Sequence, residues 1–70
     1  MDRLKYEDVI ELSHKWRDLE TQYKVDGGWI RCAETDKYFY DAHPITCDHR
    51  IVDKQTNKEV YSYYTDFYTG

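Results

Sequence analysis

Hydrophobic positions in the N-terminal third of the chain recur at alternating spacings of three and four residues. The positions that follow this spacing are Val9, Leu12, Trp16, Leu19 and Tyr23. Such spacing places all five side chains on one face of an α-helix. Gly27-Gly28 follows, and glycine readily adopts the left-handed conformation that ends a helix. The pattern therefore predicts one amphipathic helix over residues 4–25.

After residue 28 the chain changes to short segments rich in aromatic and β-branched residues, separated by polar turns. These segments predict two β-hairpins, over residues 29–41 and 45–67. Pro44 is expected to separate the two hairpins, because proline cannot donate a hydrogen bond to a strand ladder. With the helix, they predict a single α+β domain. In this domain the helix packs on one face of a three- to four-stranded antiparallel sheet.

The second hairpin is predicted to close around the polar loop at residues 54–57. Symmetric closure of this loop places Ile51 opposite Val60, and this apolar pair is expected to face the core. Tyr61 and Tyr63 then lie on the other face of the hairpin, which is expected to face solvent.

Length and charge narrow the choice of function. The chain has 70 residues, which fits one domain with a small margin of stability. Eight residues are tyrosines, and the formal net charge is −4, without the basic stripe that binding to a phosphate backbone requires. No apolar run is long enough to span a membrane, and the N-terminus lacks the apolar segment of a secretion signal. We expect a cytoplasmic protein that contacts neither nucleic acid nor membrane directly.

Four possible metal ligands lie within 18 residues of one another, namely Cys32, His43, Cys47 and His49. Their composition satisfies a structural zinc site, and a metal would stabilise a small core. Their spacing matches no standard zinc-finger pattern, and buried cysteines are common without a metal. In an intracellular protein, free thiols are favoured over a disulfide. We therefore expect no cofactor, with a zinc-stabilised structural domain as the alternative.

No catalytic pattern can be assigned. A cysteine, a histidine and Asp48 provide the residue types of a nucleophilic triad, but triads are defined by geometry and not by residue types. The paired glycines precede a predicted strand, whereas phosphate-binding loops lead into a helix. The sequence thus favours a non-enzymatic protein.

Tyrosines concentrate in the predicted sheet, of which one helix can cover only one face. Tyrosine is enriched at protein interfaces, where it offers a large contact area. Stacked aromatic residues also bind single-stranded nucleic acid, but acidic residues interleave with these and would repel phosphates. We expect the partner to be another protein with a basic surface. The residues expected to bind it are Tyr61, Tyr63, Asp48, Glu59 and Asp66.

Other interpretations of the same features remain open. The tyrosines could serve simply as strand formers whose hydroxyls reach water. A homodimer through the helix stripe or an exposed edge strand is a further alternative. In size, acidity and lack of catalytic motifs, the chain resembles small accessory proteins, including phage-encoded inhibitors of host enzymes. If the partner is a host protein that binds nucleic acid, we expect the chain to inhibit it by occluding its basic or nucleic-acid-binding surface.

Overall fold

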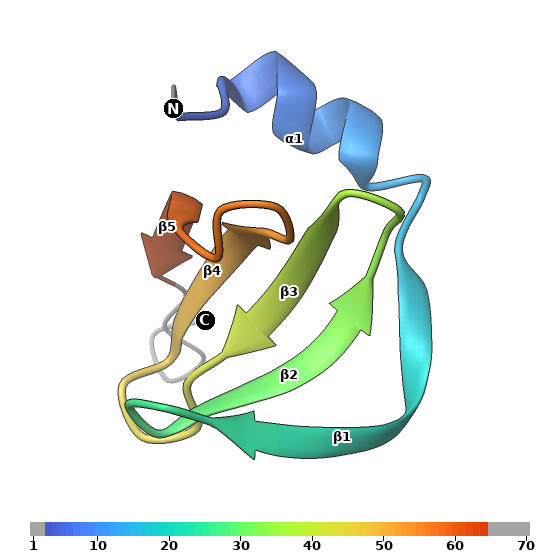
Figure 1. Cartoon of the computed structure of the whole chain (residues 1–70). Coiled ribbons are helices and arrows are strands. Elements are labelled where there is room, and N and C mark those ends of the chain that lie inside the picture. Colours follow the sequence, from blue (N-terminus) through green and yellow to red (C-terminus); the bar gives the residue numbers. More distant parts are fainter. Residues whose placement is uncertain (1–2, 65–70) are drawn as a thin grey trace, which may run out of the picture.

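The structure, a computed structural model, describes residues 3–64, which form one helix and five strands (Figure 1). Their bounds are α1 Tyr6–Leu12, β1 Arg17–Val25, β2 Trp29–Glu34, β3 Tyr38–Ala42, β4 Asp48–Asp53 and β5 Glu59–Tyr64. Each strand pairs antiparallel with the next, so the sheet order is β1-β2-β3-β4-β5. The predicted α+β class is confirmed, but the sheet has five strands instead of three or four.

The helix is much shorter than the predicted range of residues 4–25, because Arg17–Val25 forms the first strand. Within this strand, polar side chains occupy every second position. They are Asp18, Glu20, Gln22 and Lys24. Leu19 and Tyr23 therefore fit a period of two as well as a helical period. Pairing with β2 decides between the two periods, because it satisfies backbone groups of β1.

Asp26, Gly27 and Gly28 form the turn between β1 and β2 and do not end a helix. Both glycines have positive φ angles, 89° at Gly27 and 86° at Gly28. A β-carbon at Gly28 would also lie 2.9 Å from Nε2 of His43, so a side chain does not fit there. An Asp-Gly pair between alternating segments is a strong hairpin signal, which the helical interpretation overlooked.

The register of β4 and β5 differs from the prediction of symmetric closure. Ile51 pairs with Tyr61 instead of Val60, because the register shifts next to Ile51 and leaves Val60 as an extra residue on β5. A shift of one residue moves all following side chains to the other face. Tyr61 and Tyr63 therefore share the face of Ile51, and the prediction that they lie opposite it is wrong.

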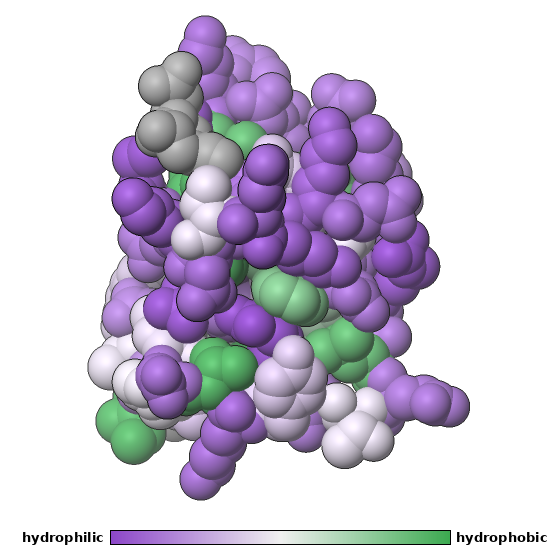
Figure 2. Space-filling model, viewed as in Figure 1, coloured by the Kyte–Doolittle hydropathy of each residue, from purple (hydrophilic) through white to green (hydrophobic). Residues whose placement is uncertain are grey.

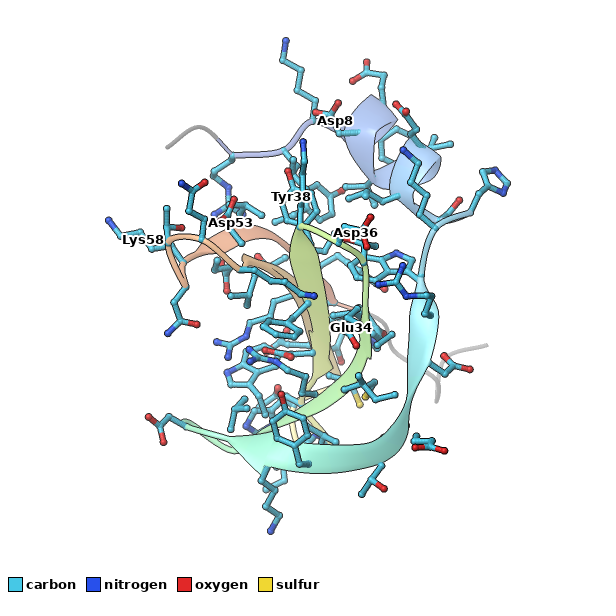
Figure 3. The ribbon with its side chains drawn as sticks, turned by 45° about the vertical axis from the view of Figure 1, so that its right-hand side comes forward. Asp8, Glu34, Asp36, Tyr38, Asp53 and Lys58 are labelled. Atoms are coloured by element: carbon cyan, nitrogen blue, oxygen red, sulfur yellow. The ribbon has the colours of Figure 1, made fainter. Side chains whose placement is uncertain are left out.

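Helix α1 lies over one end of the sheet and does not cover a face (Figure 1). None of its residues is buried. Just before it, the Leu4 amide donates a hydrogen bond of 2.8 Å to the Val60 carbonyl of β5. Figure 3 shows Asp8 of the helix above Asp36, which lies in the β2–β3 turn, and above Tyr38 at the start of β3. Val9 and Leu12 of the expected hydrophobic stripe are thus only half-buried, and the chain runs along α1 from the β5 edge towards the β1 edge.

A row of three charged side chains crosses the middle of the sheet, where Asp41 lies between Arg31 and Arg50 on adjacent strands. Arg31 donates to both carboxylate oxygens at 2.8 and 3.1 Å, and Arg50 donates from Nε at 2.9 Å. Asp41 has an exposed fraction of 0%. Its hydrogen bond to Arg31 raises the pKa of that guanidinium. These bonds offset the cost of burying the charges. The three residues are termed the charged row.

Two aromatic rings cover the arginines of the charged row. The guanidinium of Arg31 lies 4.0 Å from the centre of the Phe39 ring, and that of Arg50 lies 4.3 Å from Trp29. The ring faces attract the cations and also exclude water from them. The aliphatic core is small, and its buried residues within 3–64 are Ala33, Ile51, Val52 and Val60.

Replacement of Asp41 by alanine should destabilise the protein by about 3–5 kcal/mol, because two largely buried arginines lose their partner. Urea denaturation followed by circular dichroism measures the change. Asp36→Ala is the matched control, since it removes the exposed ion pair of 3.2 Å between Asp36 and Arg17. That control should have little effect on stability. Equal effects of the two replacements would contradict the central role of the charged row.

Candidate functional site

Aromatic side chains form a continuous row on the face of the sheet opposite to the charged row. The ring of His49 stacks on Tyr40 at 5.8 Å and on Tyr63 at 4.7 Å between centroids, with interplanar angles of 12°. Trp16 lies 5.8 Å from Tyr40, and Tyr61 lies 6.3 Å from Tyr63. These five residues are termed the aromatic row.

Strand pairing places the rings of the aromatic row together. His49 on β4 lies directly opposite Tyr63 on β5, and Ile51 lies opposite both Tyr40 and Tyr61. Directly opposed residues of antiparallel strands project from the same face. The extra residue in β5 is therefore what brings Tyr61 and Tyr63 to this face.

A hydrogen bond orients the centre of the aromatic row, where the hydroxyl of Tyr40 bonds to Nδ1 of His49. Burial raises the pKa of the Tyr40 phenol, and the neighbouring Tyr63 hydroxyl raises it further. The phenol therefore keeps its proton at neutral pH. Its hydroxyl donates a hydrogen bond to Nδ1 of His49 when the proton of the neutral imidazole is on Nε2. This bond holds the imidazole in the plane on which Tyr63 stacks.

A cavity of about 320 Å³, termed the aromatic cavity, opens beside the aromatic row. Its apolar and aromatic lining consists of Val9, Ala33, Ile51, Trp16, Tyr40 and Tyr63. Ser13 and Asp18 complete the lining, and Asp18 is the one charged residue among the described residues that border it. The cavity thus combines apolar side chains from α1 and the sheet, aromatic rings and a single carboxylate.

Three of the five residues predicted to bind a partner lie together. Asp48, Glu59 and Tyr63 line one shallow cavity, also of about 320 Å³. Tyr63 has an exposed fraction of 39% and borders both this cavity and the aromatic cavity. Tyr61 is half-buried and borders neither of them, although it contacts Tyr63. Asp66 lies outside the described residues.

The sequence pattern does not indicate Trp16, Tyr40 or Asp18 as residues of a binding site. It places Trp16 in the buried stripe of a long helix, whereas the structure places this residue beside the sheet. The alternation of polar side chains along Arg17–Val25 is the signal that indicates a strand there. In that strand Asp18 lies opposite Ala33 on β2.

The possible zinc ligands do not converge. His49 belongs to the aromatic row. The ring of His43 forms a T-shaped contact with Trp29, with centroids 5.2 Å apart, and its Nε2 lies 3.1 Å from the carbonyl oxygen of Gly27. Within residues 3–64, no three His, Cys, Asp or Glu side chains are grouped so that they could hold a metal ion. Both cysteines are free thiols, and burial raises the pKa of Cys32. Zinc binding stays a prediction from composition.

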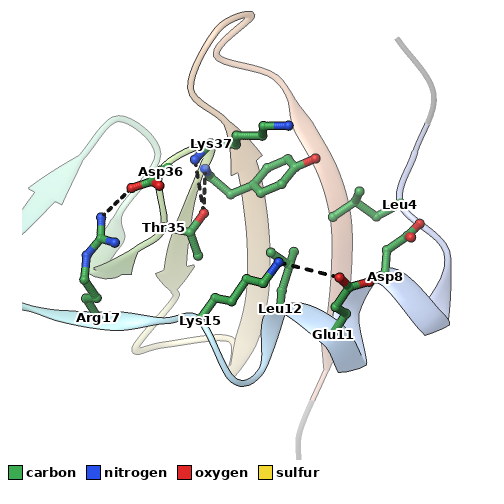
Figure 4. A pocket seen from close by; sticks show the side chains of 10 residues that line it. Leu4, Asp8, Glu11, Leu12, Lys15, Arg17, Thr35, Asp36 and Lys37 are labelled. Carbon is green, nitrogen blue, oxygen red and sulfur yellow. Dashed lines mark hydrogen bonds and ion pairs between the residues drawn. The ribbon is translucent and has the colours of Figure 1, made fainter.

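A further cavity, of about 390 Å³, separates α1 from the β2–β3 turn (Figure 4). Four of its six charged side chains form ion pairs, Lys15 with Glu11 at 3.5 Å and Arg17 with Asp36 at 3.2 Å. The carboxylate of Asp8 accepts a hydrogen bond of 2.9 Å from the Lys5 amide. Exposed pairs of this kind contribute little energy and leave little charge uncompensated. The aromatic cavity is therefore the better candidate for a binding site.

Comparisons with protein-family models, with curated proteins and with solved structures each found no match. No helix in the described part of the chain is long and apolar enough to cross a membrane. The face of the molecule in Figure 2 is mainly hydrophilic, with small separate hydrophobic patches. The geometry of the aromatic row and its cavity is therefore the basis for proposing a function.

The raised pKa of Tyr40 predicts a loss of stability at high pH. In the unfolded chain a tyrosine phenol ionises near pH 10, whereas in the folded protein Tyr40 keeps its proton to higher pH. The stabilisation is fully present below about pH 10, and the free energy of unfolding falls as the pH rises above it. Tyr40→Phe should therefore lose less stability than the unmodified protein between about pH 9 and 11.

Urea denaturation at several pH values in this range measures the effect. The matched control is Tyr6→Phe, which removes the hydroxyl of a tyrosine on α1 that is 67% exposed. The same pH dependence in Tyr40→Phe and the unmodified protein would contradict the assignment of the buried phenol.

Proposed function

We propose that this protein is a non-catalytic module that binds another protein through the aromatic row and the aromatic cavity. One observation carries the proposal. Tyr63 is 39% exposed beside this cavity, while its ring stacks on His49 at 4.7 Å. An exposed ring that is already held in place offers a partner a large apolar contact with little conformational entropy to lose.

The other members of the aromatic row support this preorganisation. His49 is oriented by its bond to Tyr40, and Trp16 packs at 5.8 Å against the far side of the row. Tryptophan and tyrosine are enriched among the residues that dominate the energy of protein interfaces. Such residues bind best where a neighbouring pocket receives a side chain of the partner, as the aromatic cavity would.

Charge favours a partner with a basic surface. Asp18 borders the aromatic cavity, and Asp48 and Glu59 border the cavity on the other side of Tyr63. The whole chain carries a net charge of −4. Negative fields of this kind steer positively charged partners and suppress acidic ones. A partner that binds nucleic acid presents a basic surface, and binding there would inhibit it by occlusion.

Replacement of Tyr63 by alanine should weaken partner binding by about thirtyfold or more, since truncation of a central aromatic anchor costs at least about 2 kcal/mol. Tyr6→Ala is the matched control, because it makes the same change at a tyrosine that is 67% exposed on α1. A partner captured from lysate by the unmodified protein is purified. Calorimetry then measures the affinity of this partner for the unmodified protein, for Tyr63→Ala and for Tyr6→Ala.

Circular dichroism and urea denaturation verify that both variants are folded. If the partner binds Tyr63→Ala as tightly as the unmodified protein, the aromatic row is not the interface. A partner whose contact surface is acidic would contradict the electrostatic part of the proposal.

A further inference from the structure

The aromatic cavity has the composition of a site for an organic cation. Three aromatic residues, Trp16, Tyr40 and Tyr63, border it together with the carboxylate of Asp18. We propose that this cavity holds the ammonium group of a lysine side chain of the partner protein, most tightly when that lysine is methylated. This inference rests on the proposed function and names the chemical group that the site takes.

The rings come from three separate segments of the chain and are not all packed face to face. Trp16 precedes β1, and its ring is inclined by 56° to that of Tyr40. The inclined contact leaves the Trp16 ring without a parallel stack, whereas Tyr40 and Tyr63 each have one face against His49 at interplanar angles of 12°. The face of an aromatic ring carries negative electrostatic potential, so a cation that lies against an uncovered ring face is attracted by it.

The two faces of the sheet differ in whether their rings already hold a cation. Phe39 lies under Arg31 and near Lys54, and Trp29 lies under Arg50. Within residues 3–64, no lysine or arginine of the chain lies over a ring of the aromatic row. The aromatic cavity therefore offers the interaction that the rings of the other face already make internally.

Asp18 supplies the negative charge that a cation requires. Its position on β1, opposite Ala33, places it beside the apolar lining of the cavity. Among the ion pairs within residues 3–64, none involves Asp18. No basic residue of this range borders the cavity. The charge of Asp18 is therefore available to a ligand.

The apolar part of the lining suits the stem of a lysine. Val9, Ala33 and Ile51 contribute aliphatic surface to the aromatic cavity. A lysine side chain buries its methylene groups against such surface while its ammonium group seeks a polar partner. Methylation lowers the cost of removing water from the ammonium group and increases its contact with aromatic rings.

The test compares two probes that differ only in charge. They are N-acetyl-trimethyl-lysine methylamide and its neutral isostere, in which carbon replaces the ammonium nitrogen. NMR titration of the full chain, followed at the indole N–H of Trp16, gives both dissociation constants. The cation should bind about 5- to 30-fold more tightly than the isostere, the range expected for cation–aromatic attraction.

Asp18→Asn should weaken binding of the cationic probe by about two- to fivefold and leave the isostere unaffected. Glu20→Gln is the matched control, since it removes the same charge from an exposed position of the same strand that does not border the cavity. This control should bind the cationic probe like the unmodified protein.

Equal affinity for the two probes, or no binding of the cation at millimolar concentration, would overturn the inference. Failure of the inferred cation site can be distinguished from failure of the proposed function. If Tyr63→Ala loses the partner while both probes bind equally, only the cation site is refuted. If the cation binds selectively but does not compete with the partner, the role of the cavity in partner binding is refuted.

Discussion

The buried carboxylate of Asp41, held between Arg31 and Arg50, is the interaction on which the rest of the structure depends. The aliphatic core is too small to define the sheet alone, since only four hydrophobic residues in the described part of the chain are buried. The charged row crosses three adjacent strands. A shift of one residue between any two of these strands would leave a buried charge without its partner, which is far more costly than the loss of an aliphatic contact. The ionic group thus enforces the register of the central strands.

The same register positions the opposite face. Once Asp41 lies opposite Arg50, the neighbouring residues Tyr40 and His49 must project to the other side of the sheet. The irregularity in β5 then adds Tyr63 to the row. The two faces consequently have different properties. One satisfies its charges and its aromatic rings internally, whereas the other leaves rings and a carboxylate accessible around a cavity. A small chain can in this way combine a specific fold with a preorganised surface for binding.

The short helix completes this arrangement without acting as a hydrophobic cover. Its own residues are not buried, but Val9 reaches the aromatic cavity, and the segment that follows it delivers Trp16 to the aromatic row. The hydrogen bond from Leu4 to β5 ties the start of this segment to the sheet. The aromatic cavity therefore depends on contacts between the N-terminal segment and strands that are distant from it along the chain.

The sequence by itself determined the α+β class, the position of the strands after residue 28 and the concentration of tyrosines in the sheet, because turn residues and local periodicity act over a few positions. It did not determine the end of the helix, since Leu19 and Tyr23 fit both periods and only pairing with β2 selects the strand. Nor did it reveal the extra residue in β5, which decides the face of Tyr61 and Tyr63. Of the residues predicted to bind a partner, Tyr63 borders the aromatic cavity, whereas Asp48 and Glu59 line the neighbouring one. The assembly of Trp16, Tyr40 and Asp18 around one cavity required the tertiary structure, because it depends on contacts between segments that lie far apart in the chain.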